Sequence, residues 1–508
     1  MQARKIAVLV VHGIGEQKCF DMMEEIALNF VKGLRKQNRG HVQVIHGDQT
    51  PKRSAELSWR ELPLRVSWKT SKNQWMEVSF REVFWADLDL EMSWKRYWRL
   101  VGWTLSMSGV RAFSPNGNPG GTEEDDPAGH GLRSPLAPGF WRRLGDRAIL
   151  FLVSVAVSPI LILNALQRYF LARLRINFPQ IDRIIYNYLG DVMLYQDWVL
   201  REDRVECFGE KSRVAIRRRM AQALLRTAAQ VENGSLDGYY ILAHSLGTVV
   251  AFNGLMETGP SLPNYLTEDE WANFPQSLKS QMAPTGADQM ARRPPWLSPN
   301  DGINRKQVLS KLLGFLTLGS PLDKFAALWP AIVPIHKEGT RSPIRWANIA
   351  DVQDIVAGRL DLLTNPGQAP GGTNALPVEG FQLRNYEWVW GRLLFTAHTS
   401  YWKVRKNRHS LMESVVDWIE NSNGPFALPP NLFSVNAARF CFGASVLLCG
   451  VLALYAGSWA LWSLYRWDLW ELPPFWFALW VATFSAGLVL FFSVFRRIRE
   501  RWKFGPQR

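Results

Sequence analysis

The stretch YYILAHSLGTVVAF, residues 239–252, places a serine where one short apolar run ends and another begins. The first run is rich in residues that favour strands, and the second has the composition of a buried helix. Ser245 therefore lies in a predicted strand-to-helix turn, between the small residues Ala243 and Gly247. This matches the nucleophile-elbow pattern G-x-S-x-G, except that Ala243 replaces the first glycine. Ser245 is either a nucleophile or only a polar turn residue, and the rest of the chain has to discriminate between the two.

Strands alternate with helices on both sides of this stretch. KIAVLVV, residues 5–11, is a continuous apolar run typical of a strand buried on both faces, and residues 19–37 have helical periodicity. This alternation predicts an α/β fold with a mostly parallel sheet flanked by helices. Further strands are predicted at residues 64–68, 74–88 and 315–318 and within SPIRWANIADVQDIV, residues 342–356.

The composition of the 508 residues limits the classes of molecule that this protein is expected to bind. The formal net charge is +14, and 24 residues are tryptophan, which favours surfaces that are apolar on one side and wet on the other. A basic surface is typical of proteins that bind nucleic acid or anionic lipid, and of the positively charged flanks of membrane segments, but no nucleic-acid motif accompanies the charge here. We therefore expect lipid headgroups, not nucleic acid. The four cysteines form no CxxC pair, so neither a metal site nor a disulfide framework is expected.

Two apolar runs near the C-terminus, residues 440–464 and 475–495, are each long enough to cross about 30 Å of hydrocarbon. We interpret residues 437–497 as a transmembrane helical hairpin, with two buried core helices as the alternative. The basic tail, residues 498–508, is cytoplasmic by the positive-inside rule. A hairpin returns the preceding chain to the same side, so we expect the catalytic domain at the cytoplasmic face of a membrane.

An insertion, residues 91–178, divides the predicted core into residues 1–90 and 179–432. It contains an apolar run, AILFLVSVAVSPILIL at residues 148–163, flanked by arginines. A single crossing there would put the two parts of the core on opposite sides of the bilayer, although both must meet in one site. We therefore expect a lid that dips into the lipid face. The alternative is a true span paired with a second crossing at residues 97–110.

Glycines follow the first predicted strand in HGIG, residues 12–15. Glycine lets the main chain turn its N–H groups toward a developing negative charge. We predict Gly13 and Ile14 as oxyanion donors, together with Leu246, the residue after the serine. His12 is expected to anchor this loop and not to take part in catalysis.

Taken in order, VLVVHGIGEQ, AHSLG, GSPLD, DVQDIV and AHTSYW resemble the motifs of α/β-hydrolases of the lipase and esterase type. The resemblance covers about residues 1–90 and 180–420 and implies an α/β-hydrolase fold. It also implies Ser245 as nucleophile, Asp354 as acid and His398 as base in a Ser-His-Asp triad. Such a triad hydrolyses an acyl ester, most often of a lipid, and needs no metal or organic cofactor.

The base is chosen among the histidines that follow Ser245, because this family has the order serine, acid, histidine. His398 follows a short apolar run, as a base on a loop after a late strand does. His336 precedes the candidate acids, and His409 lies in the basic run WKVRKNRHS. We therefore select His398.

Two aspartates in DVQD, Asp351 and Asp354, follow the same predicted strand. We prefer Asp354 as the acid and keep Asp351 as the alternative, with Asp323 in GSPLD as a remote option. His244, directly before the serine, is expected to shape the substrate pocket without transferring protons. The basic helix around residues 217–219 is expected to present a solvated face.

The sequence thus predicts a membrane-anchored serine hydrolase that cleaves acyl esters of lipids. A thioesterase or an acyltransferase on the same fold is an alternative, because the elbow looks alike in these enzymes. The other alternative is a non-catalytic, membrane-tethered interaction protein on a hydrolase-like fold.

Overall fold

The computed structural model describes the part of the chain that carries the predicted core and most of the predicted site residues. The described residues are 3–13, 19–46, 64–88, 195, 212–282, 291–328, 332–333, 343–354, 356–361, 363, 380–389, 395–404, 409–421, 424–428, 431, 434–438 and 440–441.

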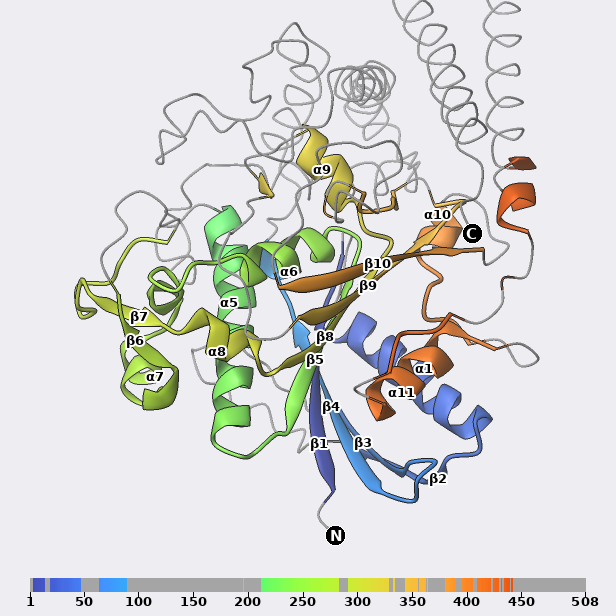
Figure 1. The fold of residues 1–508 in the computed structure, drawn as a ribbon, viewed down its shortest axis with the longest axis horizontal. Coiled ribbons are helices and arrows are strands. Elements are labelled where there is room, and N and C mark those ends of the chain that lie inside the picture. The colour runs from blue at the N-terminus through green and yellow to red at the C-terminus, as the bar shows by residue number, and fades with distance from the viewer. Residues whose placement is uncertain are drawn as a thin grey trace, which may run out of the picture.

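A mostly parallel sheet of eight strands runs through this part of the chain, in the order β10-β9-β8-β5-β1-β4-β3-β2 (Figure 1). The strands from β10 to β4 are parallel, whereas β3 pairs antiparallel with both β4 and β2. The predicted α/β class with a mostly parallel sheet is therefore confirmed. The strands are β1 (Arg4–Val11), β2 (Gly40–His46), β3 (Leu64–Lys69), β4 (Trp75–Val83), β5 (Gly238–His244), β8 (Leu312–Leu318), β9 (Ile344–Asp351) and β10 (Phe381–Trp388).

The central strand β1 is buried on both faces, as its unbroken apolar run predicts. Alternate side chains point to opposite sides, so Leu9 joins one core cluster and Val10 the other. Helices α5 and α6 cover the first face, and α1 and α11 cover the second (Figure 1). Full burial of one such side chain contributes about 1.5–3 kcal/mol. These helices are α1 (Asp21–Lys36), α5 (Ser212–Glu232), α6 (Gly247–Leu255) and α11 (Leu411–Glu420).

Shorter elements complete the described part of the chain. A separate two-stranded sheet is formed by β6 (Lys279–Gln281) and β7 (Asp301–Ile303). The short helices are α7 (Glu268–Ala272), α8 (Arg305–Leu309), α9 (Leu322–Leu328) and α10 (Phe395–His398). Single 3₁₀ turns are η1 (Ala86–Leu88), η6 (Leu262–Tyr265) and η7 (Gln276–Leu278).

The basic helix α5 does not present a solvated face, so that expectation is wrong. Arg213 and Arg217 are only 2% and 3% exposed. Arg217 donates to Glu257 across 2.6 Å in a buried ion pair, and Arg219 donates to the Phe84 carbonyl at 2.7 Å. The arginines thus tie the helix to the loops around it, because a charge taken out of water needs a partner.

The predicted membrane parts lie mostly beyond these elements. The insertion at residues 91–178, the basic tail and almost all of the hairpin at residues 437–497 are outside the described residues. Within the described residues, no helix has both the length and the apolar character needed to cross a bilayer.

Candidate active site

The serine predicted as nucleophile lies in a sharp turn between β5 and α6. Ser245 has φ of 53°, in the left-handed region that costs a non-glycine residue about 1–2 kcal/mol. Its main-chain N–H donates to the Leu318 carbonyl of β8 at 3.0 Å. Its side-chain oxygen is buried and has no hydrogen-bond partner among the described residues. A structural turn serine normally bonds its hydroxyl to nearby main chain, so this geometry suits a nucleophile better.

The turn after β1 touches the turn after β5. A Cβ atom at Gly13 would lie 2.5 Å from Ser245 Cβ, and one at Gly247 would lie 2.3 Å from the His12 carbonyl oxygen. These glycines are therefore required by close approach of the main chain. β1 and β5 are neighbours from which the chain proceeds to opposite halves of the sheet. Ligands of open α/β sheets bind at such a switch point, beyond the carboxyl ends of the strands.

His398 and Asp354 meet at the same edge of the sheet. His398, at the end of α10, has Nδ1 2.8 Å from Asp354 Oδ2, and both side chains are buried. The carboxylate of Asp351 makes a different contact: its Oδ1 accepts the Gln353 N–H at 2.9 Å. This hydrogen bond stabilises the turn after β9. The geometry therefore favours Asp354 over Asp351 as the partner of the histidine.

The carboxylate of Asp354 is held by hydrogen bonds at both oxygens. Oδ2 accepts from His398 Nδ1 and from the Tyr401 hydroxyl, each at 2.8 Å. Oδ1 accepts the N–H groups of Val356 at 2.8 Å and Ala357 at 3.2 Å. Burial raises the pKa of Asp354, but these bonds outweigh it and the pKa lies below its ordinary value. An ionised Asp354 keeps the proton of a neutral His398 on Nδ1 and leaves Nε2 as the acceptor.

Two contacts place His398 beside the serine turn. The His244 ring donates from Nε2 to the His398 carbonyl at 2.8 Å, and the two rings are 4.6 Å apart. Gly319, which follows Leu318, has φ of 62°, and a Cβ there would lie 3.1 Å from His398 Nδ1. The residues directly before Ser245 and directly after its hydrogen-bond partner Leu318 thus both contact His398.

His244 is a buried, neutral imidazole. Burial, and then the neighbouring His398, lower the pKa of His244 to about 3. Because Nε2 donates to a carbonyl, Nδ1 carries no proton and can only accept. His244 therefore cannot donate to an oxyanion; its role in shaping a substrate pocket stays a prediction.

His12 anchors its loop, as expected from the sequence. Its Nδ1 binds the Gly13 carbonyl at 2.9 Å, and its Nε2 accepts the Trp85 N–H at 3.0 Å. The Trp85 indole returns a hydrogen bond to the His12 carbonyl and stacks on the ring at 4.8 Å. These hydrogen bonds and the ring stacking fix the main chain next to Gly13.

Leu246 is the N-cap residue of α6 and is fully buried. The first N–H groups of a helix have no acceptor within it, which suits the predicted role of Leu246 as oxyanion donor. Ile14, the other predicted donor, lies outside the described residues.

Among the other candidate bases and acids, His409 is held away from Asp354 by a different carboxylate. His409 binds Glu413 at 2.8 Å at the start of α11 and is 40% exposed in its side chain. Asp323 is buried in the first turn of α9. His336 lies outside the described residues.

Sequence reasoning missed three supporting residues. Thr248 Oγ1 donates to the Ser245 carbonyl at 2.7 Å and lies 2.8 Å from Ser320 Oγ, which joins the serine turn to the turn after β8. Tyr401 bonds Asp354 from the segment that carries His398. Its position three residues after a candidate base was the available signal.

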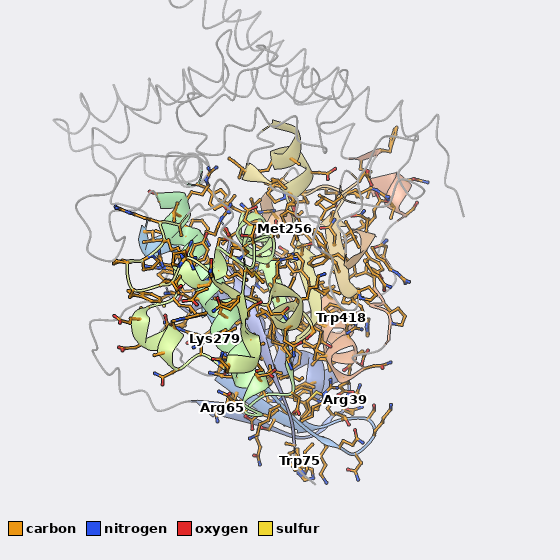
Figure 2. All side chains as sticks on the ribbon, turned by 60° about the vertical axis from the view of Figure 1, so that its left-hand side comes forward. Arg39, Arg65, Trp75, Met256, Lys279 and Trp418 are labelled. Carbon is orange, nitrogen blue, oxygen red and sulfur yellow. The ribbon has the colours of Figure 1, made fainter. Side chains whose placement is uncertain are left out.

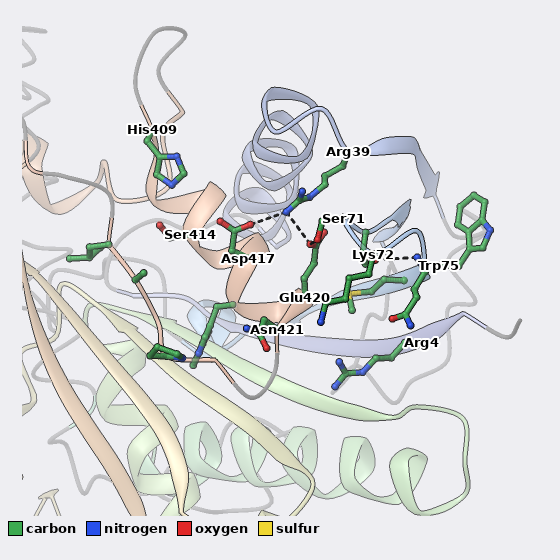
Figure 3. Close-up of a pocket in the computed structure, with 17 residues that line it drawn as sticks. Arg4, Arg39, Ser71, Lys72, Trp75, His409, Ser414, Asp417, Glu420 and Asn421 are labelled. Atoms are coloured by element: carbon green, nitrogen blue, oxygen red, sulfur yellow. Dashed lines mark hydrogen bonds and ion pairs between the residues drawn. The ribbon is translucent and has the colours of Figure 1, made fainter.

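A large cavity in the described part of the chain lies away from these residues. It encloses about 870 Å³ between the start of β1, the β3–β4 hairpin and α11 (Figure 3). Arg39 crosses it to Asp417 and Glu420 at 2.9 and 3.0 Å. Figure 2 shows Trp75 of this region at one end of the molecule and Met256, after α6, toward the other. The cavity lies at the amino end of β1 and is lined by none of Ser245, His398 and Asp354.

Comparisons with protein-family models, with curated proteins and with solved structures find no match to this chain.

Proposed function

We propose that this protein is a serine hydrolase of the α/β-hydrolase type, with Ser245 as nucleophile, His398 as base and Asp354 as acid. The observation that carries the proposal is the buried 2.8 Å hydrogen bond between His398 and Asp354, held beside the strained turn of Ser245. Three segments distant in sequence supply this arrangement, and a non-catalytic protein has no need of a strained serine with an unused hydroxyl.

The tautomer of His398, with its proton on Nδ1 and Nε2 free to accept, determines the steps of the proposed reaction. Ser245 Oγ attacks the carbonyl carbon of an ester while His398 Nε2 takes the hydroxyl proton. Asp354 stays ionised and stabilises the imidazolium, and the N–H groups of Leu246 and Gly13 bind the oxyanion. His398 then protonates the leaving alcohol, and an acyl-enzyme remains. Water, deprotonated by His398, attacks the acyl-enzyme and releases the carboxylic acid with Ser245 restored.

The proposed substrate is an acyl ester of a lipid, such as a phospholipid or glycerolipid, drawn from the bilayer. The apolar insertion at residues 148–163 and the apolar C-terminal runs support this class, because they suit contact with acyl chains. We place the protein at a membrane through the hairpin at residues 437–497, with the catalytic domain and the basic tail on the cytoplasmic side.

The test uses the full chain in membranes, treated with a fluorophosphonate probe. Wild type is expected to be labelled, Ser245→Ala is expected not to be, and Ser310→Ala is the labelled control. Ser310 directly follows α8, and its hydroxyl donates to the Gln307 carbonyl in the same turn at 2.7 Å. Protein that is folded by circular dichroism yet unlabelled would contradict the proposal.

Mass spectrometry of lipids then identifies the reaction. Incubation with defined phospholipid and diacylglycerol vesicles is expected to release fatty acid with wild type and not with Ser245→Ala. Transfer of the acyl group to another lipid would identify an acyltransferase, and turnover of acyl thioesters alone a thioesterase.

A further inference from the structure

Tyr401 places one hydroxyl between the end of β9 and the carboxylate of Asp354. The side chain is buried, and its oxygen accepts the Asp351 N–H at 2.9 Å. The same hydroxyl lies 2.8 Å from Asp354 Oδ2. Because a main-chain N–H can only donate, the hydroxyl accepts there and must donate its proton to Asp354. The direction of both bonds is therefore fixed.

The oxygen that Tyr401 binds is the one that binds the candidate base. Asp354 Oδ2 accepts from the Tyr401 hydroxyl and from His398 Nδ1 at equal distances of 2.8 Å. Burial, and then the nearby carboxylates of Asp354 and Asp351, raise the pKa of Tyr401 well above its ordinary value. The phenol thus stays protonated and donates throughout the pH range in which an esterase works.

The ring of Tyr401 is fixed by its surroundings. A Cβ atom at Gly319 would lie 3.0 Å from its Cε2 atom, so the main chain after β8 packs directly on the ring. Tyr401 follows His398 by three residues, in the described segment 395–404. One short segment thus carries both the base and the group that binds the acid.

Building on the proposed triad, we propose that Tyr401 is a positioning residue of the catalytic machinery: its hydroxyl holds Asp354 Oδ2 in line with His398 Nδ1. A carboxylate turns easily about its last side-chain bond, because that torsion has only broad minima. The two main-chain bonds hold Oδ1, and the tyrosine bond fixes the oxygen that faces the imidazole. Without it, the acid loses a charge-assisted bond and its orientation toward the base.

Other charged and titratable groups surround Asp354. His244 of β5 and Asp351 of β9 interact with this site, and Lys324 of α9 donates to the Val356 carbonyl at 2.7 Å. Removing the hydroxyl leaves all of these in place. Its bond is one of those that lower the pKa of Asp354, so its loss raises that pKa.

The experiment compares Tyr401→Phe with wild type in the full chain, using hydrolysis of p-nitrophenyl butyrate from pH 4 to 9. The kcat is expected to fall about ten- to a hundredfold, the effect of one hydrogen bond to a charged group, with KM within about twofold. The acidic limb of kcat is expected to move to higher pH, because a carboxylate that loses this donor attracts the proton on the neighbouring imidazole more strongly. Active-site titration with a fluorophosphonate normalises kcat to the folded fraction.

Tyr386→Phe is the matched control. Tyr386 of β10 is half-buried, and its hydroxyl donates to the Phe426 carbonyl at 2.8 Å, away from the triad. This variant is expected to keep the wild-type kcat and pH profile.

A second change keeps the proposal testable if Tyr401→Phe does not fold. Incorporation of 3-fluorotyrosine at position 401 preserves both bonds and makes the hydroxyl a stronger donor, so the acidic limb is expected to move to lower pH. If neither change alters the normalised kcat or the acidic limb, the role of Tyr401 is overturned and the proposed hydrolase activity is left intact. Loss of activity and of Ser245-dependent labelling already in wild type would instead overturn the proposed function.

Discussion

The ring of His244 donates a hydrogen bond to the main-chain carbonyl of His398 at 2.8 Å. The last residue of β5, immediately before the proposed nucleophile, thus holds the main chain of the proposed base. This hydrogen bond directly joins two segments that lie 154 residues apart in the sequence.

The contribution of His244 to the free energy of unfolding depends on pH. The pKa of His244 is about 3 in the folded protein and about 6.5 ordinarily, so the unfolded chain binds more protons between these values. Its contribution is complete above about pH 6.5 and is lost as the pH falls toward 3. We expect His244→Phe to lose about 1–3 kcal/mol at pH 7.5, since the His398 carbonyl loses its donor. Between pH 6.5 and 4, the variant should lose stability less steeply than wild type in urea-unfolding measurements, whereas parallel curves would exclude the buried neutral ring.

Asp354 and Asp351 are distinguished by matched amides. Asp354→Asn is expected to lower kcat by about 10⁴-fold, because an amide favours the wrong tautomer of His398 and cannot stabilise its cation. Asp351→Asn keeps an oxygen for the Gln353 N–H and should retain kcat within about fivefold. Steady-state hydrolysis of p-nitrophenyl butyrate measures both variants, and the reverse order of effects would make Asp351 the acid.

Gly13 tests the contact between the turns after β1 and β5. Gly13→Ala puts a methyl group 2.5 Å from Ser245 Cβ if nothing moves, so one turn has to shift. A displacement of about 1 Å in an active site costs about a hundredfold in rate, and we expect a fall of this size in kcat. Gly40→Ala is the control, because its Cβ meets only Lys69 Cβ at an ordinary 3.8 Å. Equal rates for the two variants would show that the turns do not need this close approach.

Local sequence was sufficient for the strand, the turn and the helix around Ser245. The exception in the motif, Ala243, is accommodated because its methyl group is buried in the core beside Val11 and Thr317 of the neighbouring strands. The pattern of β1 likewise predicted a strand buried on both faces, since alternation of side chains in a strand is a local property.

Long-range partners could not be predicted in this way. Asp351 and Asp354 both follow β9, and only the position of His398, forty-four residues after Asp354, separates them. The burial of Arg217 depends on Glu257, forty residues away. Such partners depend on how distant segments pack, which the periodicity of a single segment does not record.

The central position of β1 has a consequence for synthesis of the protein. β1 precedes the other described strands in the sequence, yet its neighbour β5 comes far later. The hydrogen bond from the Lys5 N–H to the Asp237 carboxylate, at the start of both strands, spans 232 residues. At about 5–20 residues per second, the nascent chain carries an apolar strand without this neighbour for roughly 12–46 s. Protection of this strand by a chaperone or by the membrane surface during translation would therefore limit aggregation before the sheet closes.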